Sequence, residues 1–480
     1  METSSFECNK QSIERYVKTL NNFAKSWLRR PDWAKPDLYN QRMVSSSVAL
    51  TAPPTFRNVP LDNGLTVLVQ EVHTAPLVSV WCWYGVGSRD EGIGLTGASH
   101  WVEHMNFKGT IHIPREEMKG IVERFGGMWN GYTWIDQTTY LETAGRSALD
   151  QMLFIEAERM NNSLFDAEEC ESERTVVISE LQGGDNDPEQ VLDTELTATA
   201  FRAHTYRHPT IGWLHDLQAM TRDDLYAHYR RYYVPNNATL VVVGDVESDD
   251  VLRRVERHFG RIPEGGVPSR LKVAEPPQLG ERRVRVDREG TTAYLKFGFH
   301  APSATDPDFF PMLVLDAILT GAKGLNLWSS FRVAPPQRKS RLYTALFERG
   351  LASQVNGALL ATADPFLYTL SFTATEGVRL PVLEEAVFAA MEPVAAGRIE
   401  DGEVARAKRQ LRARLVFEDD SVTHVAHQLG FFETVVGPGF YPRLQACIDA
   451  VTADQVRDVA GRRLRRNQLT VGSFQPLESR

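Results

Sequence analysis

The sequence predicts an α+β fold built from two homologous domains behind a short N-terminal region. Three observations support this prediction. The chain has 480 residues, more than a single hydrophobic core usually organises. Apolar β-type runs alternate with amphipathic helical patterns along the chain. The order of these patterns over residues 55–262 recurs over residues 275–480, as a repeated fold requires.

Composition and charge exclude several classes of protein. Hydrophobic residues make up 42% and charged residues 24%, a globular profile that argues against a disordered or fibrous protein. The 53 Lys and Arg residues against 62 Asp and Glu residues give a net charge of −9, which offers no electrostatic reason to expect nucleic acid or an anionic membrane as partner. No stretch approaches the roughly 20 apolar residues of a membrane-spanning helix. The four cysteines are far apart and form no C-x-x-C motif, so we expect a reducing compartment and a cytoplasmic location.

Residues 1–54 are expected to contain an amphipathic helix followed by a linker. Within residues 10–29 apolar side chains recur at helical spacing, at Ile13, Val17, Leu20, Ala24 and Trp27. Glu2, Glu7 and Glu14 argue against a secretory or mitochondrial signal sequence. The helix would dock on the body of its own chain, with binding to a partner as the alternative. The prolines that follow predict a linker.

The first domain, residues 55–262, begins with a predicted β-hairpin. Asn63-Gly64 is a turn signal between two strand-like runs, residues 57–61 and 65–72. The elements expected after it are a strand at 77–84, helices at 97–108 and 115–125, a strand pair within 127–143, helices at 146–160 and 166–182, and a strand at 238–243. The Pro- and Gly-rich stretch 260–277 marks the boundary to the second domain.

The second domain, residues 275–480, repeats the first with little sequence identity. Residues 403–415 align with residues 169–181 at a constant offset of 234, and Leu411 and Leu415 take the places of Val177 and Leu181. Farther on, Thr452 takes the place of Thr221 at the start of a helical pattern. Matching spacing with weak identity indicates a repeated fold, with chance similarity of amphipathic helices as the alternative.

Candidate metal-ligating residues occur in the helix expected at 97–108. His100 and His104 are four residues apart, so on a helix their imidazoles lie on one face and can bind one ion. Glu103 lies near the same face, where it can act as general base for a water that the metal activates. Zinc is the metal that an open site of nitrogen and oxygen ligands favours. A surface helix that carries two histidines and a carboxylate is the structural alternative.

A third ligand is expected from the helix at 166–182, because a catalytic zinc site uses three protein ligands and one open position. Glu173 and Glu180 are seven residues apart, hence on one stripe of the helix. Val176 and Val177 belong to the same stripe and should face the core. A buried carboxylate needs a cationic partner, which a metal would provide for Glu180. Glu173 could orient a ligating histidine through its second ring nitrogen, and the alternative is a solvated acidic helix.

The second domain lacks these acids. At the offset of 234, Ala407 takes the place of Glu173 and Arg414 the place of Glu180, and no H-x-x-E-H motif precedes them. A purely structural pair of acids would be expected in both copies of a repeated fold. The pattern therefore indicates one active site and one inactive copy.

Four motifs, in order, resemble those of the pitrilysin, insulin-degrading enzyme and mitochondrial processing peptidase family. The inverted zinc motif HWVEH lies within residues 95–110, and ERTVVISE at 173–180 looks like the family's third-ligand segment. Asn130-Gly131-Tyr132-Thr133 resembles its substrate-strand motif, and YYVPNNATLVVVGD at 232–245 resembles the end of its first domain. The resemblance covers about residues 55–480, and the length is similar to that of the bacterial half-size branch.

The resemblance implies a zinc-dependent endopeptidase with two αβ sandwich domains that form half of a clamshell. It assigns one zinc ion per chain to His100, His104 and Glu180. It also assigns the role of general base to Glu103 and that of supporting acid to Glu173. The implied mechanism is water activation by zinc, attack on the scissile carbonyl, and return of the proton from Glu103 to the leaving amine.

The resemblance also implies how substrates and partners bind. Asn130 and Gly131 would bind the substrate main chain as an added strand at the sheet edge, independently of its sequence. Short or unfolded peptides are the implied substrates, and removal of a leader or presequence is one such reaction. A half-size chain is implied to form a dimer, with itself or with a related subunit.

One segment departs from the family pattern. Active members usually carry an Arg and a Tyr in the second domain that bind the carbonyl oxygen of the scissile bond. Here Ser340-Arg341-Leu342-Tyr343 is present, but Phe347 and Ser353 occupy the positions of that Arg and Tyr. Loss of an oxyanion donor typically costs about 10²–10³ in rate.

Three interpretations follow from this departure. The chain is a self-sufficient peptidase in which Arg349 or Tyr343 substitutes for the missing pair, or it is the catalytic subunit of a heterodimer whose partner supplies the pair. The third interpretation is a non-catalytic scaffold subunit.

Overall fold

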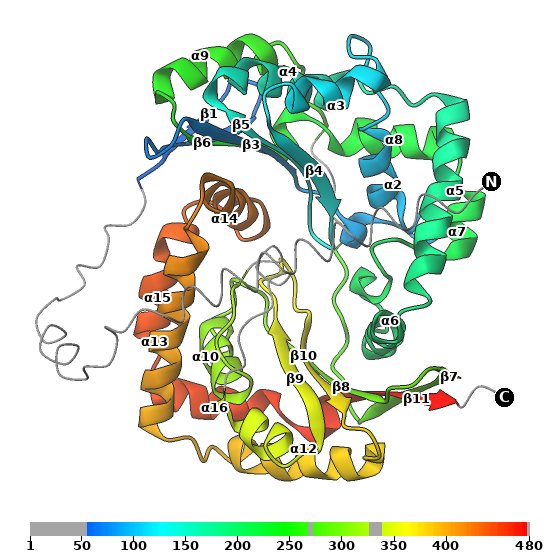
Figure 1. Ribbon diagram of the computed structural model, residues 1–480, viewed down its shortest axis with the longest axis vertical. Coiled ribbons are helices and arrows are strands. Elements are labelled where there is room, and N and C mark those ends of the chain that lie inside the picture. The colour runs from blue at the N-terminus through cyan, green and yellow to red at the C-terminus, as the bar shows by residue number, and fades with distance from the viewer. Residues whose placement is uncertain (1–54, 267–271, 326–337, 478–480) are drawn as a thin grey trace, which may run out of the picture. The chain divides into compact units, whose positions relative to one another are not determined.

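The computed structural model describes residues 55–266, 272–325 and 338–477 (Figure 1). The predicted N-terminal helix and linker, residues 1–54, lie outside the described residues. Two β-sheets form the framework, one from each half of the chain. None of the described helices is both long enough and apolar enough to span a membrane.

The first sheet has six strands in the order β1-β2-β6-β3-β5-β4. Along the chain they are β1 (Arg57–Pro60), β2 (Thr66–Glu71), β3 (Leu77–Tyr84), β4 (Met128–Thr133), β5 (Thr138–Gly145) and β6 (Ala238–Gly244). Every residue of the central strand β3 after Leu77 is buried. Successive side chains of a strand point to opposite faces, so Trp81 and Trp83 join one core and Val80 and Cys82 join another. The sheet is therefore covered on both faces, which explains why β3 reads as a continuous apolar run.

The second sheet has five strands in the order β7-β11-β8-β10-β9. They are β7 (Arg282–Glu289), β8 (Tyr294–His300), β9 (Ala352–Leu359), β10 (Leu367–Ala374) and β11 (Leu469–Leu477). Without β1, the first sheet has the same order, and in each sheet the first strand of this order pairs parallel to the last strand of the half. The predicted α+β fold with two homologous domains is confirmed by this shared topology.

The helices of the two halves correspond as well. In the first half they are α2 (Ala98–Met105), α3 (Arg115–Glu123), α4 (Leu149–Asn161), α5 (Ala167–Gly184), α6 (Pro188–Ala200), α7 (Leu214–Ala219), α8 (Arg222–Tyr232) and α9 (Ser248–Phe259). In the second half they are α10 (Phe309–Leu319), α12 (Leu380–Ala395), α13 (Asp401–Glu418), α14 (Val422–Val435), α15 (Leu444–Ala450) and α16 (Ala453–Arg463). α5 and α13 each have 18 residues and keep the predicted offset. α8 and α16 each begin with a capping box, at Thr221 and Thr452.

Each half contributes one helix to the sheet of the other half. α14 packs against β3 and β6, and α6 packs against β8 and β11 (Figure 1). This exchange places Trp81 and Trp83 in the same core as the helices of the second half. The strands of the first sheet lie within residues 57–244 and those of the second within residues 282–477. One hydrophobic core contains residues of both halves, so the halves stabilise each other.

Replacing Gly430 by alanine is expected to destabilise the contact between the halves. A Cβ atom at this position of α14 would lie 1.9 Å from Nε1 of Trp83 in β3, so helix or sheet must shift. We expect the free energy of unfolding, measured by urea denaturation, to fall by about 1–3 kcal/mol. Gly402→Ala is the matched control, because Gly402 lies in α13 with open space around it. It should leave stability unchanged or increase it. Equal effects of the two substitutions would contradict the packing described.

Candidate metal centre

The two histidines of the predicted motif lie on one face of α2. The helix begins after Gly97, whose φ of +91° favours glycine. His100 and His104 lie one turn apart, and their Nε2 atoms are 3.3 Å apart. Burial and the neighbouring His104 lower the pKa of His100 to about 3. Its imidazole is therefore neutral near pH 7 and has a nitrogen lone pair available for a metal.

Glu180 of α5 completes a group of three candidate ligands. Its Oε1 atom is 3.9 Å from Nε2 of His100, and its Oε2 atom is 3.6 Å from Nε2 of His104. The candidate ligand atoms of the three residues all lie within 4.8 Å of one another. We call these three residues the metal cluster.

The dimensions of the metal cluster fit a zinc ion. A tetrahedral zinc ion with ligands at about 2.0–2.1 Å holds its ligand atoms about 3.3 Å from one another. The two histidine nitrogens already have this separation, at 3.3 Å. The Glu180 side chain is 52% exposed, so its carboxylate can rotate toward the two histidines at little cost. Two nitrogens and one carboxylate oxygen also match the ligand types of open zinc sites.

Glu173 orients one of the ligands. Its Oε1 atom accepts a hydrogen bond from Nδ1 of His104 at 2.8 Å, and Lys108 forms an ion pair with its other oxygen. Burial acts to raise the pKa of Glu173, but the bonds from His104 and Lys108 outweigh it and lower the pKa. Burial acts to lower the pKa of His104, but the hydrogen bond to Glu173 and the nearby carboxylates outweigh it, and the pKa of His104 is raised. With the proton on Nδ1, the lone pair of Nε2 of His104 is available to bind a metal ion.

Replacing Glu173 by glutamine is expected to weaken zinc binding by about 10–100-fold, because the orienting carboxylate of a ligating histidine typically contributes that much. Competition with a chromophoric chelator would measure the affinity. Glu168→Gln is the matched control, since Glu168 is an exposed glutamate on the same helix. An unchanged affinity in Glu173→Gln, or an equal loss in Glu168→Gln, would contradict the orienting role.

Glu103 is buried beside the metal cluster. Its side chain accepts a hydrogen bond from the Thr133 hydroxyl at 2.9 Å, and the residue is 7% exposed. Burial raises the pKa of Glu103 to about 7, against the lowering effects of His104 and Thr133. A carboxyl group with a pKa near neutrality can both accept and return a proton.

The predicted substrate strand is an edge strand. β4 ends the first sheet and pairs only with β5 among the described strands, with Asn130 opposite Leu141 and Gly131 opposite Tyr140. A side chain at Gly131 would meet the ring of Phe107 at 2.9 Å, so this glycine permits close packing. Peptide binding by Asn130 and Gly131 stays a prediction.

A cavity of about 710 Å³ opens beside the metal cluster. Its lining includes His100 and Glu180, together with Thr133 at the end of β4 and Trp134 directly after it. The end of the edge strand and two of the three residues of the metal cluster therefore line one space.

The burial expected in α5 is wrong at two positions, Val176 and Glu180. Val177 is buried and Glu173 is 4% exposed, as predicted, but Val176 is 47% exposed. Adjacent residues of a helix lie about 100° apart, so the buried stripe that holds Val177 and Glu173 does not extend to Val176. Glu180, expected to be buried, is 52% exposed and approaches the two histidines from the border of this stripe.

Three positions with contacts to the site were not identified from the sequence. Thr133 holds Glu103, and Lys108 pairs with Glu173. Glu91 accepts hydrogen bonds from the backbone N–H groups of Gly97 and Ser99, at 2.8 and 2.7 Å, and thereby caps α2. Thr133 lies within a motif noted above, but its bond depends on how β4 lies against α2, which no local pattern encodes.

Two family models match the chain. Residues 66–212 match the model described as insulinase (peptidase family M16), and residues 219–411 match the peptidase M16 inactive domain. The chain belongs to the M16 peptidase family. The metal cluster, Glu103 and Glu173 all lie in the part that matches the insulinase model of M16. Ala407, which takes the place of Glu173, lies in the part that matches the M16 inactive domain.

Known proteins of similar sequence and structure agree with the M16 assignment. A probable mitochondrial-processing peptidase subunit beta of Arabidopsis thaliana is 27% identical over 97% of this chain and 86% of its own length. Zinc protease PqqE of Helicobacter pylori is 29% identical over 78% of this chain and 82% of its own. The crystal structure of a protease from Helicobacter pylori superimposes with a TM-score of 0.79 at 26% identity, covering 88% of this chain and all of that one.

The structure shows the contacts of the segment that departs from the family pattern. Phe347 is 40% exposed and stacks on Tyr343, with ring centroids 4.4 Å apart. Ser353 lies in β9, and its hydroxyl donates to the carbonyl oxygen of Thr373 at 3.4 Å. Arg341 forms an ion pair with Glu403. Neither Phe347 nor Ser353 offers the cation or phenol that the resemblance expects at its position.

Proposed function

We propose that this M16 family member is a zinc-dependent endopeptidase that cleaves short or unfolded peptides. The observation that carries the proposal is the arrangement of the metal cluster beside the buried carboxyl group of Glu103. Three candidate ligands with a neighbouring general base are the minimum apparatus of a zinc peptidase. Membership of a peptidase family and relatives named zinc proteases support it.

Each residue of the site has a role in this proposal. His100, His104 and Glu180 would hold one zinc ion per chain. When bound, zinc supplies a Lewis acid that activates water and polarises the scissile carbonyl group. Glu103 accepts the proton of the attacking water and donates it to the leaving amine nitrogen. Thr133 keeps the Glu103 carboxyl group oriented, and Glu173 keeps Nε2 of His104 directed at the metal.

The edge strand supports the proposed class of substrate. An extended peptide that adds to β4 binds through main-chain hydrogen bonds, which carry no sequence information. A folded domain offers few free extended segments, so short and unfolded peptides are preferred, and removal of a leader or presequence is the corresponding biological reaction. The cysteine pattern supports a cytoplasmic location as part of the proposal.

A heterodimeric enzyme is the second candidate. The Phe347 side chain has no hydrogen-bond donor and the Ser353 hydroxyl donates to Thr373, so neither replaces the Arg and Tyr of the family pattern. Several relatives are named mitochondrial-processing peptidase subunit beta. We propose that a related subunit with the Arg and Tyr pair completes the site. In the first candidate, the self-sufficient peptidase, the chain would form a homodimer.

Peptide cleavage by the purified chain, alone and after addition of a related subunit, separates the two candidates. Activity of the chain alone that a zinc chelator removes and zinc restores would support the self-sufficient peptidase. Activity only in the mixture would support the heterodimer. A zinc-loaded, folded chain without activity in either form would contradict both and leave a scaffold subunit.

A further inference from the structure

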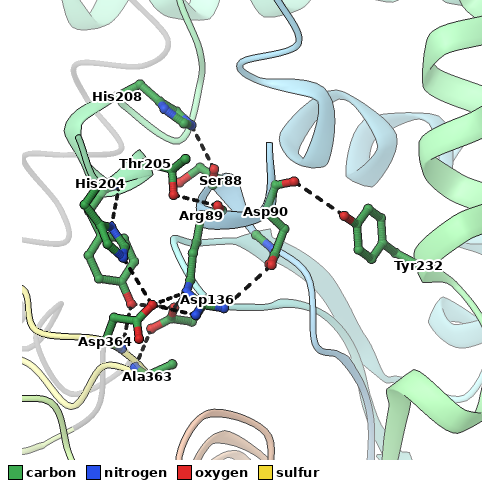
Figure 2. Close-up of polar contacts among 12 residues, drawn as sticks. Ser88, Arg89, Asp90, Asp136, His204, Thr205, His208, Tyr232, Ala363 and Asp364 are labelled. Atoms are coloured by element: carbon green, nitrogen blue, oxygen red, sulfur yellow. Dashed lines mark hydrogen bonds and ion pairs between the residues drawn. The ribbon is translucent and has the colours of Figure 1, made fainter. Parts of the chain in front are cut away.

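A largely buried polar cluster joins the two halves of the chain next to the metal-ligand helix. At its centre is the turn Ser88–Asp90, which precedes α2 in the chain (Figure 2). Arg89 and Asp90 are 8% and 7% exposed. No step of the proposed mechanism uses these residues, although buried charges are costly and are retained where they are paired.

The turn is bonded to both elements that carry the proposed chemistry. The backbone N–H groups of Ser88 and Arg89 donate to the carbonyl oxygens of Trp134 and Ile135, at 3.1 and 2.9 Å, directly after β4. Glu91, the next residue after the turn, caps α2. A displacement of the turn would therefore change the position of α2, which carries Glu103, relative to β4.

The second half holds this turn through the connection between β9 and β10. Asp364 accepts hydrogen bonds from Nε of Arg89 at 2.7 Å and from Nε2 of His204 at 3.1 Å (Figure 2). Nδ1 of His204 accepts from the N–H of Tyr206, so Nε2 carries the proton. The N–H of Ala363 donates to Asp136, which lies in the β4–β5 turn.

Asp364 differs from its neighbours in exposure. Arg89 also faces Asp90 at 3.7 Å and Asp136 at 3.9 Å, and both of these carboxylates have side chains only 2% exposed. The Asp364 side chain is 32% exposed. Removing it leaves Arg89 with two carboxylates and leaves no buried charge without a counter-ion, so the fold should persist.

We propose that Asp364 is a positioning residue, through which the second half fixes the metal-ligand helix relative to the substrate strand. Asp364 acts through Arg89 and the Ser88–Asp90 turn, and the inference rests on the proposed peptidase function. The domain that matches the M16 inactive domain would thereby contribute to catalysis without supplying a reacting group.

The test compares Asp364→Ala with Asp308→Ala in the zinc-loaded full chain. Asp308 is the matched control, because its carboxylate pairs with Arg462 and Arg463 within the second half and its side chain is 16% exposed. We expect Asp364→Ala to lower kcat about tenfold with KM nearly unchanged, since misplacement of catalytic groups by about 1 Å can cost up to 10²-fold. Asp308→Ala should lower the melting temperature at least as much and leave kcat unchanged. Asp364→Glu, which restores a carboxylate, should recover most of the rate.

Hydrogen exchange of the metal-free chain gives a readout that needs no activity. Amides in residues 88–99 should exchange faster in Asp364→Ala than in the wild type and at the wild-type rate in Asp308→Ala. Unchanged kcat and unchanged exchange in Asp364→Ala would overturn the inference, as would an equal loss of kcat in Asp308→Ala. If the wild-type chain and its mixture with a related subunit cleave no peptide, the proposed function fails. Hydrogen exchange then tests only whether Asp364 holds the Ser88–Asp90 turn: faster exchange in Asp364→Ala supports this role, and unchanged exchange overturns it.

Discussion

Replacing Glu103 by glutamine is expected to lower kcat for peptide cleavage by about 10²–10⁴-fold, the usual contribution of a positioned general acid–base group. Glutamine has the same shape and can still accept the hydrogen bond from Thr133, but it cannot take up a proton. The zinc content should stay at one ion per chain, because Glu103 is not among the three residues of the metal cluster. Steady-state cleavage of an unstructured peptide at saturating concentration, with metal analysis of the same sample, measures both quantities.

Glu117→Gln is a suitable control for this substitution. Glu117 is an exposed glutamate of α3, and it should tolerate the change with full activity. A Glu103→Gln variant that retains zinc and cleaves at the wild-type rate would show that another group transfers the proton.

Replacing Glu180 by glutamine is expected to weaken zinc binding by at least about 100-fold. The effect should exceed that of Glu173→Gln, because Glu180 is a proposed ligand and Glu173 only orients one. At submicromolar zinc the variant should lose its metal and therefore its cleavage activity. Part of the activity should return when zinc is added in excess. The fold should be retained, because the Glu180 side chain is half exposed while buried Cys170 and Val177 anchor α5 in the core.

The expected order of zinc affinities is a strict test of the metal cluster. The wild type should bind most tightly, followed by Glu173→Gln and then by Glu180→Gln. Arg414 occupies the position of Glu180 in α13, so Arg414→Gln should not change the zinc affinity. An affinity in Glu180→Gln equal to that of the wild type would remove Glu180 from the proposed site.

Much of the fold could be predicted because it depends on local patterns that are repeated. The helix of Glu173 and Glu180 was expected to begin at Asp166, and the Asp166 side chain does accept hydrogen bonds from the N–H groups of Glu168 and Glu169. Capping and apolar periodicity likewise place α5 and α13 at the predicted offset of 234 residues. Capping and helical periodicity involve residues within a few positions of one another, so a single sequence encodes them directly.

The exchange of α6 and α14 between the sheets could not be predicted in this way. Val425 to Phe432 of α14 are all buried, which marks a helix covered on every side. The pattern does not state which sheet covers it. Gly430, which fits α14 against Trp83, looks in isolation like an ordinary unfavourable glycine within a helix.

The residues of the candidate site also fall into two groups, those that a local sequence pattern predicts and those that only the structure shows. His100, Glu103 and His104 share one helical turn, so their spacing indicates their chemistry. Thr133 and Asp364 act across distances of 30 and 275 residues in the chain. Their contributions depend on the packing of the sheets, which only the structure supplies.

Zinc titration of the purified, metal-free chain during peptide cleavage tests whether this protein is a zinc-dependent peptidase, with a related subunit present if the chain alone is inactive. We predict no cleavage without metal and a rise to full rate that ends at one zinc ion per chain, with Glu103→Gln binding the same amount of zinc and remaining inactive. Cleavage that persists without metal, or a fully zinc-loaded chain that cleaves no peptide in either form, would contradict the account.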